Sequence, residues 1–213
     1  MPDKIEVECT LFRVTVPNHV HLLYAVQGPN SDQAVFDQSF RQVEVRFHPP
    51  SRAELIAKAA AAGVARLVKS VSGLLFLVVL VLAARNTREM GILTIAFLAA
   101  EWLARPLAPR LPLAFSPEFL EALLALTVAY LAAEIVFLPE SQARWAVVPV
   151  LGVAHGLAFA AFPPPYLTAA EAAQALLLGV LWLAARKMPV AWRRPAAGVM
   201  LVAGIGWFAR MLV

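Results

Sequence analysis

His155 is the residue of this chain with the clearest potential for chemistry. It lies within residues 148–160, where every other residue is apolar, glycine or proline. An ionisable side chain at membrane depth is costly, so such a residue is by default a candidate functional site. The imidazole is a candidate proton carrier or metal ligand. The alternative is a structural hydrogen bond to a backbone carbonyl or to Glu121 across a helix interface.

The neighbours of His155 indicate a helix that packs closely against another. Four residues here have the spacing i, i+3, i+4 and i+7, which places side chains on one helical face. They are Gly152, His155, Gly156 and Phe159. Glycine on such a face lets a second helix approach closely. We therefore expect helix-packing contacts at Gly152, Gly156 and Phe159.

Further polar side chains interrupt the apolar sequence around this segment. If successive spans alternate in direction, these side chains lie toward the same end of the bundle, which we call end A, where the first span begins. They are Glu101, Glu121, Glu171, Gln174 and Arg210. Acids and an arginine could pair there, which is how membranes tolerate such groups. In the alternative, those near helix ends simply reach the membrane interface.

Glu134 lies toward the opposite end, which we call end B. It is on a helical face with Thr127 and Tyr130, and we favour a hydrogen bond between helices for it. With His155, Glu101 and Glu121 form a candidate pathway for a cation or a proton.

The composition indicates a membrane environment. The chain has 213 residues, of which 61% are hydrophobic and 15% charged, and its mean hydropathy is +0.71. A soluble domain carries about a quarter charged residues, so the apolar excess indicates several membrane spans. The single cysteine excludes an internal disulfide framework. We expect the lipid bilayer as a partner and no nucleic acid, because the net charge of +4 first suggests membrane topology.

The elements that position these residues are predicted to form an all-α polytopic membrane helix bundle of about six transmembrane helices. The expected spans are residues 64–84, 90–105, 117–138, 144–162, 169–186 and 194–213. Helix starts are predicted at Ser51–Glu54, Ser116–Glu118 and Thr168–Glu171, each with a capping residue. Pro106 and the prolines after it are expected to end the second span.

The first fifty residues are different in character. Alternating apolar and polar residues predict short strands near residues 5–11, 22–26 and 43–47, with a turn at 27–32. The predicted organisation is a small β-rich extramembrane segment (1–50), a juxtamembrane helix or linker (51–63) and a six-helix transmembrane domain (64–213).

The loop charges bear on orientation. The loops at end B carry Arg85, Arg88, Arg144, Arg186, Lys187, Arg193 and Arg194. The positive-inside rule then places end B in the cytoplasm, although basic residues before the first span favour the reverse. We expect a multi-pass protein of the bacterial cytoplasmic membrane with an extracytoplasmic N-terminal segment.

Several segments in order along residues 70–213 resemble the hydrogenase/urease accessory membrane-protein family, HupE/UreJ. They are Leu74–Phe76, Phe97–Trp102, Glu121–Thr127, Glu134, Arg144–Trp145, His155–Ala160, Glu171 with Gln174, and Gly206–Trp207 with Arg210. The resemblance implies about six helices and, for characterised relatives, uptake of nickel or a related metal. Family members often carry an extracytoplasmic β-rich domain before the helices.

This chain departs from the family pattern where the chemistry would lie. The family's Asp-His pair is Ser72–Gly73 here, and the histidine of its Ala-His-Ser motif is Glu101. One remaining imidazole is a poor transition-metal site. His155 is retained as a candidate ligand for a divalent ion, and no cofactor is predicted.

We therefore expect a non-catalytic structural or accessory subunit of a larger membrane complex, with protein partner subunits. The alternative is a permease for a metal cation or protons that uses Glu101, Glu121 and His155. An enzyme is not expected, because the sequence has no phosphate-binding loop, no paired CxxC cysteines and no nucleophile elbow.

Overall fold

The chain divides into two compact units, residues 1–55 and 56–213. The computed structural model describes residues 4–11, 20–37, 40–111 and 115–211, and each unit is described here by itself. Four strands belong to the first unit and seven α-helices are assigned in the described parts of the chain. A small strand region followed by a helical bundle confirms the predicted fold class.

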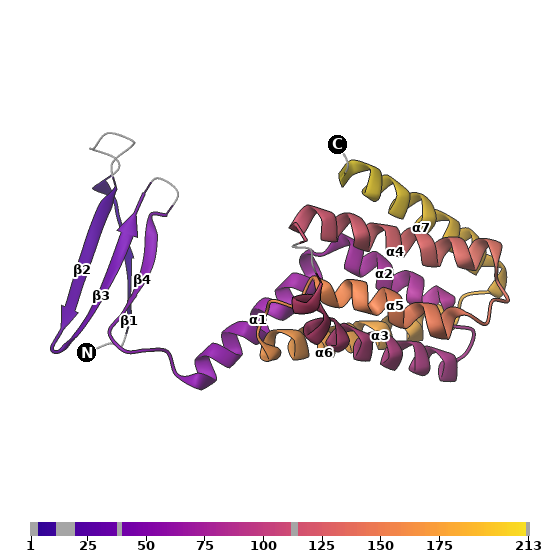
Figure 1. Cartoon of the computed structure of the whole chain (residues 1–213), viewed down its shortest axis with the longest axis horizontal. Helices are drawn as coiled ribbons and strands as arrows, with labels where there is room; N and C mark the ends of the chain where they lie inside the picture. The colour runs from indigo at the N-terminus through magenta and orange to yellow at the C-terminus, as the bar shows by residue number, and fades with distance from the viewer. Residues whose placement is uncertain (1–3, 12–19, 38–39, 112–114, 212–213) are drawn as a thin grey trace. The chain divides into compact units, whose positions relative to one another are not determined.

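The strands of the first unit form two antiparallel pairs (Figure 1). They are β1 (Lys4–Glu8), β2 (His21–Gln27), β3 (Asn30–Phe36) and β4 (Gln42–Arg46). β1 pairs with β4, and β2 forms a hairpin with β3 through Gly28, whose φ of 58° favours glycine. The predicted turn at 27–32 is too long, because Asn30–Asp32 belong to β3.

The buried core of the first unit is small. It consists of Ala34, Phe36 and Val45, on β3 and β4. The carboxylate of Asp32 links the same two strands: Oδ2 accepts the backbone N–H of Arg46 and Oδ1 that of Gln33, both at 2.8 Å.

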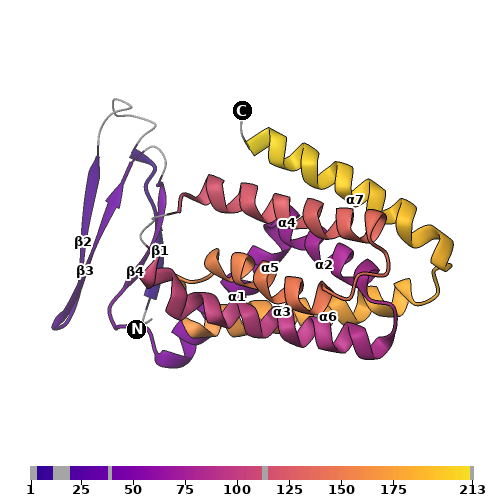
Figure 2. The ribbon, with the colours of Figure 1, turned by 45° about the vertical axis from the view of Figure 1, so that its right-hand side comes forward.

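The second unit is a helical bundle (Figure 2). Its helices, the first of which begins in residues of the first unit, are α1 (Arg52–Lys69), α2 (Val71–Ala83), α3 (Thr87–Leu107), α4 (Pro117–Phe137), α5 (Arg144–Leu157), α6 (Pro164–Ala185) and α7 (Val190–Met211). From Leu74 onward α2 is apolar around its whole circumference, and Phe76, Leu77, Val79 and Leu80 are at most 1% exposed. Such a helix must be central, and α2 packs against α4, α6 and α7.

Two helix pairs have the most extensive contacts, α3 with α5 and α4 with α7. Glycine permits close approach in both. A Cβ at Gly152 would lie 2.7 Å from the carbonyl oxygen of Phe97, and one at Gly204 would lie 2.8 Å from the backbone nitrogen of Ala129. Either distance is too short for a real side chain, so these helices meet at backbone distance.

Short polar side chains start several helices. Ser51 Oγ accepts the backbone N–H of Glu54, and Ser116 Oγ that of Phe119, which confirms both predicted starts. The predicted cap at Thr168 is wrong. α6 already begins at Pro164, because proline at a first helical position is preorganised, and the Thr168 hydroxyl donates to backbone carbonyls within the helix.

The expected span 64–84 is not one straight helix. α1 and α2 meet at a break near Ser70 and are bent by 74°. Ser70 caps α2 by accepting the backbone N–H of Gly73 at 3.1 Å, so it starts a new helix within the apolar sequence. α3 in turn continues through Pro106 to Leu107, contrary to the predicted end, and the predicted stop at Pro112 lies outside the described residues.

By length and composition, three helices could cross a membrane: α3 with its 3-10 extension to Arg110, α4 and α6. The bent pair α1–α2 makes a fourth if it is one span, and α5 is a shorter apolar helix of 14 residues. Six crossings are therefore not confirmed.

Candidate functional site

His155 lies on α5 and is 3% exposed. Its Nε2 is 3.0 Å from Thr127 Oγ1 on α4, and the Thr127 hydroxyl also lies 2.6 Å from the carbonyl oxygen of Leu124. A hydroxyl has one proton, so if Thr127 donates it to Leu124, His155 carries its proton on Nε2 and donates to Thr127. The partner of His155 is thus a neutral hydroxyl, neither the backbone carbonyl nor the Glu121 considered from sequence.

Two aromatic rings complete the surroundings of His155. The ring centroid of Phe76 on α2 is 4.3 Å from the imidazole centroid, and that of Phe97 on α3 is 5.4 Å away in an edge arrangement. Apolar rings supply no proton acceptor and no metal ligand. Within the described residues, His155 therefore lies in a packed core with one polar contact, the Thr127 hydroxyl.

Of the predicted packing residues, Gly152 and Gly156 face α3 from α5, and Phe159 lies just after the end of α5. A Cβ at Gly156 would overlap the carbonyl oxygen of Glu101 and lie 2.7 Å from Cβ of Ala104. Phe159 is 6% exposed and belongs to a small cluster with Tyr166 and Leu167.

Glu101 on α3 is completely buried, and its contact is with Gln174 on α6. Gln174 Nε2 donates to Glu101 Oε1 at 3.3 Å, while Glu101 Oε2 and Gln174 Oε1 have no hydrogen-bond partner among the described residues. One turn away on α6, Glu171 Oε2 accepts the indole N–H of Trp102 at 2.6 Å. Two acids and an amide thus lie along the α3–α6 interface.

Glu121 on α4 belongs to a different group. Its Oε1 accepts the hydroxyl of Ser72 at 2.7 Å and the indole N–H of Trp207 at 3.3 Å. Arg210 does not pair with an acid among the described residues. Its guanidinium carbon lies 5.2 Å from the centroid of the Trp207 ring instead.

The structure therefore distributes the predicted residues over three separate groups. His155 binds Thr127, Glu101 and Gln174 bind each other with Glu171 nearby, and Glu121 binds Ser72 and Trp207. Within the described ranges, no group of three or more His, Cys, Asp and Glu side chains could hold a metal ion. A divalent ion at His155 would have to find its other ligands elsewhere.

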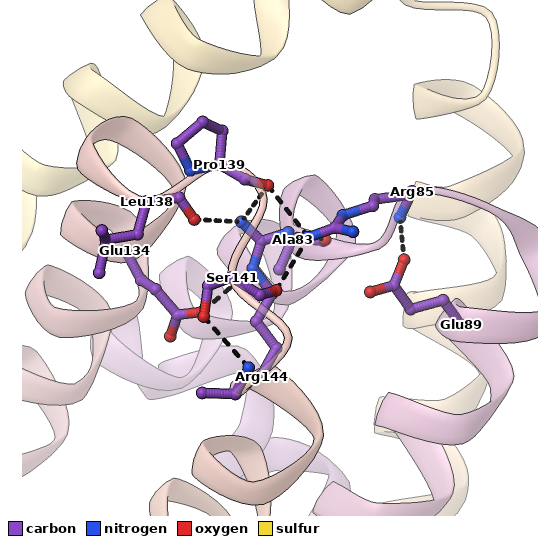
Figure 3. Close-up of polar contacts among 9 residues, drawn as sticks. Ala83, Arg85, Glu89, Glu134, Leu138, Pro139, Ser141 and Arg144 are labelled. Atoms are coloured by element: carbon purple, nitrogen blue, oxygen red, sulfur yellow. Dashed lines mark hydrogen bonds and ion pairs between the residues drawn. The ribbon is translucent and has the colours of Figure 1, made fainter.

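A fourth polar group, at end B, is built around Arg144 (Figure 3). Arg144, at the start of α5, is 3% exposed, and its Nε lies 3.2 Å from Glu134 Oε1 on α4. Nη1 donates to the carbonyl of Ala83 at 2.8 Å, and Nη2 to that of Pro139 at 3.1 Å. One buried guanidinium thereby joins the ends of α2 and α4 to the start of α5.

Two further arginines bind the same loops. Arg85 donates to the carbonyls of Pro139 and Ser141 at 3.1 and 2.8 Å, and Arg193 to that of Ala84 at 2.6 Å. These bonds connect the 84–86 loop with the α4–α5 loop and with the first turn of α7.

Sequence reasoning missed most of these partners. It noted Ser72 and Thr127 without assigning them contacts, and it counted Arg144 as a loop charge. A usable signal existed for the end-B group, since Glu134 and Arg144 flank a short loop that must return the chain into the bundle. No comparable signal pairs Trp102 with Glu171 or Trp207 with Glu121.

An apolar bundle with buried polar groups at both ends and long apolar helices defines a multi-pass membrane protein. The family model described as HupE / UreJ protein matches residues 42–180, and the chain belongs to this family. The match begins at β4, whereas the resemblance seen in the sequence begins at residue 70. It ends within α6, so α7 lies outside the match. Comparisons with curated proteins and with solved structures gave no match.

Proposed function

We propose that this HupE/UreJ-family protein is a non-catalytic accessory subunit of a larger membrane complex, and that the strand unit contacts the partner. The observation that carries the proposal is an apolar face on the β2–β3 hairpin. Leu22, Tyr24 and Val26 alternate along β2 and are 80%, 62% and 59% exposed, and Val35, opposite Leu22, is 56% exposed.

Exposed strands of this kind belong outside the hydrocarbon region, because an open sheet edge leaves backbone groups unpaired there. Outside the membrane, a contiguous apolar patch on one sheet face favours a protein contact. The face also carries an aromatic ring, Tyr24, of the type that is enriched in interface cores.

The polar groups of the bundle support a structural role. His155 is held by Thr127 between two phenylalanine rings, and Glu121 is held by Ser72 and Trp207. Each contact joins two helices and so stabilises the packing of the bundle. Ser72 and Glu101 also replace residues of the family motifs that carry metal-binding side chains.

A second candidate function is a permease for protons or a hard cation at end A. It is favoured by the unpaired oxygens Glu101 Oε2, Gln174 Oε1 and Glu171 Oε1. Oxygen ligands of this kind suit a hard cation better than nickel. In this alternative His155 and Glu121 do not share the ion, since they belong to other groups.

Regarding topology, the proposal places end B in the cytoplasm and the strand unit outside it. The arginines gathered in the end-B loops support this orientation.

The test is recovery of partner chains with the full-length protein extracted in a mild detergent. We expect Tyr24→Ser to reduce the recovered partner at least ten-fold, because it removes an exposed interface ring. Phe40→Ser is the matched control, since Phe40 is 66% exposed in the same unit but lies between β3 and β4. A monodisperse monomer from the native membrane would contradict the proposal.

The permease alternative is tested separately by uptake of divalent cations and protons into vesicles containing the purified chain. Under the accessory proposal, Glu101→Gln and His155→Ala leave uptake at the background of empty vesicles. Uptake above background that Glu101→Gln abolishes would favour the alternative.

A further inference from the structure

We propose that an arginine-lined pocket at end B binds the phosphate of an anionic phospholipid headgroup. The pocket has a volume of about 800 Å³ and lies between the 84–86 loop, the α4–α5 loop and the first turn of α7. Four arginines line it, Arg85, Arg144, Arg193 and Arg194, together with one acid, Glu140. Phosphate oxygens are the natural partners of guanidinium groups.

The positive charge of this pocket is only partly compensated. Glu134 is paired with Arg144, and Glu89 accepts the backbone N–H of Arg85 at 2.8 Å. Arg85 and Arg193 donate to backbone carbonyls, which carry no net charge. Arg194 is exposed and has no hydrogen bond or ion pair to any described residue. Among the described residues, Arg85, Arg193 and Arg194 form no ion pair, so an anion in the pocket would meet three unpaired guanidinium charges against one lining acid, Glu140.

Two helix starts add to the attraction. Val190, Ala191 and Arg193, from the first turn of the 22-residue helix α7, line the pocket. Arg144 is the first residue of α5, whose N-cap Ala143 makes no side-chain capping bond. The first N–H groups of a helix have no partner within it, and together with the helix dipole they favour an anion.

The apolar part of the pocket indicates a lipid rather than a soluble anion. Leu82, Ile135 and Val190 line it next to the arginines, and Val190 is 80% exposed. A basic pocket between helices at the membrane surface is a known way to hold an anionic headgroup.

The opposite face of the same turns of α7 is apolar. A second pocket, of about 460 Å³, is lined only by apolar residues, among them Met188, Trp192 and Val199. Trp192 is 64% exposed, as expected for an indole at the membrane interface. This apolar face of α7 is suited to contact with the hydrocarbon of the bilayer, which puts the arginine-lined pocket on the same turns at the level of the headgroups.

The test is native mass spectrometry of the full-length chain released from phosphatidylcholine nanodiscs that contain phosphatidylglycerol. We expect the wild-type protein to retain phosphatidylglycerol in preference to phosphatidylcholine. Arg194→Gln should weaken retention about five-fold, the effect of one basic side chain near an anionic surface. Arg194→Lys, which keeps the charge, should retain the lipid within about two-fold of wild type.

Arg186→Gln is the matched control. Arg186 is an exposed arginine at the end of α6 at the same end of the bundle, and it does not line the pocket. Its removal should leave retention unchanged. Equal losses in Arg186→Gln and Arg194→Gln, or equal retention of the two lipids by wild type, would overturn the proposal. So would displacement of the lipid by millimolar inorganic phosphate, which would indicate a site for soluble anions.

Discussion

At the two ends of the helical bundle, a buried glutamate is held in two different ways. At end B, Glu134 is 7% exposed and forms an ion pair with Arg144, whose remaining N–H groups donate to backbone carbonyls. At end A, Glu101 is 0% exposed and accepts a hydrogen bond from the side-chain amide of Gln174. Among the described residues, no cation forms an ion pair with Glu101.

Glu134 and Glu101 therefore differ in how much each contributes to the stability of the bundle. The Glu134–Arg144 pair joins three chain segments, so both partners are needed once they are buried. Glu101 lies at a point where α3 and α5 already meet through Gly156. At end A, then, close packing holds the helices together and the carboxyl group contributes little. The following variants test this contrast.

Breaking the pair at end B should have the largest effect. Arg144→Ala leaves Glu134 buried without its cation and removes the guanidinium donor of the Ala83 carbonyl, so the free energy of unfolding should fall by about 3–5 kcal/mol. Denaturant titration in detergent micelles measures this change. The double variant Glu134→Gln/Arg144→Met should lose less than the sum of the two single variants. Additive losses would mean that the two side chains act independently.

Overpacking at end A should come next. Gly156→Ala places a methyl group against the backbone of Glu101 and should destabilise the bundle by about 1–3 kcal/mol. Gly179→Ala is the control, because a Cβ there meets nothing within 4 Å. It should be neutral or slightly stabilising, since alanine favours a helix. The same unfolding titration compares the two variants, and a tolerated Gly156→Ala would remove packing as the explanation for end A.

Neutralising the glutamate at end A should have a small effect. Glu101→Gln keeps the shape and a hydrogen bond to Gln174, so we expect less than about 1 kcal/mol of change in the free energy of unfolding. Glu134→Gln, the equivalent change at end B, should cost several times more because it leaves Arg144 without its counter-charge. Equal losses at the two ends would eliminate the contrast.

The smallest effect is expected outside the bundle, where a carboxylate is held by backbone N–H groups. The bonds from Arg46 and Gln33 lower the pKa of Asp32 below its usual 3.8. The resulting stabilisation of the β3–β4 contact is complete above pH 3.8 and is lost as the pH falls through the lower folded-state value. Hydrogen exchange of residues 42–47 should be faster in Asp32→Asn than in wild type at pH 6. The two should converge near pH 2, and a difference independent of pH would exclude the charge as its source.

The sequence predicts most helices but fewer of the contacts between them. Ser116 and Ser51 correctly predict helix starts, because an N-cap is a local interaction. β3 was missed because residues 30–33, Asn-Ser-Asp-Gln, favour a turn, and only pairing with β2 makes them a strand. The break at Ser70 was missed because serine fits either a continuous helix or a cap.

The candidate site could be predicted only in outline. The depth of Glu101, Glu121 and His155 follows from their place along each helix, but their partners depend on how each helix is rotated about its axis. A rotation of one residue, about 100°, changes the neighbour completely. The contact between Trp207 and Glu121 depends on such a rotation, so the sequence does not predict it. The contact between Arg144 and Glu134 is easier to predict, because the short α4–α5 loop keeps the end of α4 near the start of α5.

The glycine contacts have a consequence for motion. Gly152 and Gly156 hold α5 against the α3 backbone, and Gly204 holds α7 against α4. Turning either helix about its axis would bring a β-carbon into the contact and force the pair apart. Each pair should therefore move as one rigid body, and a conformational change would alter the angle between the α3–α5 body and the α4–α7 body. The Thr127–His155 hydrogen bond joins α4 to α5, so its length would report that angle.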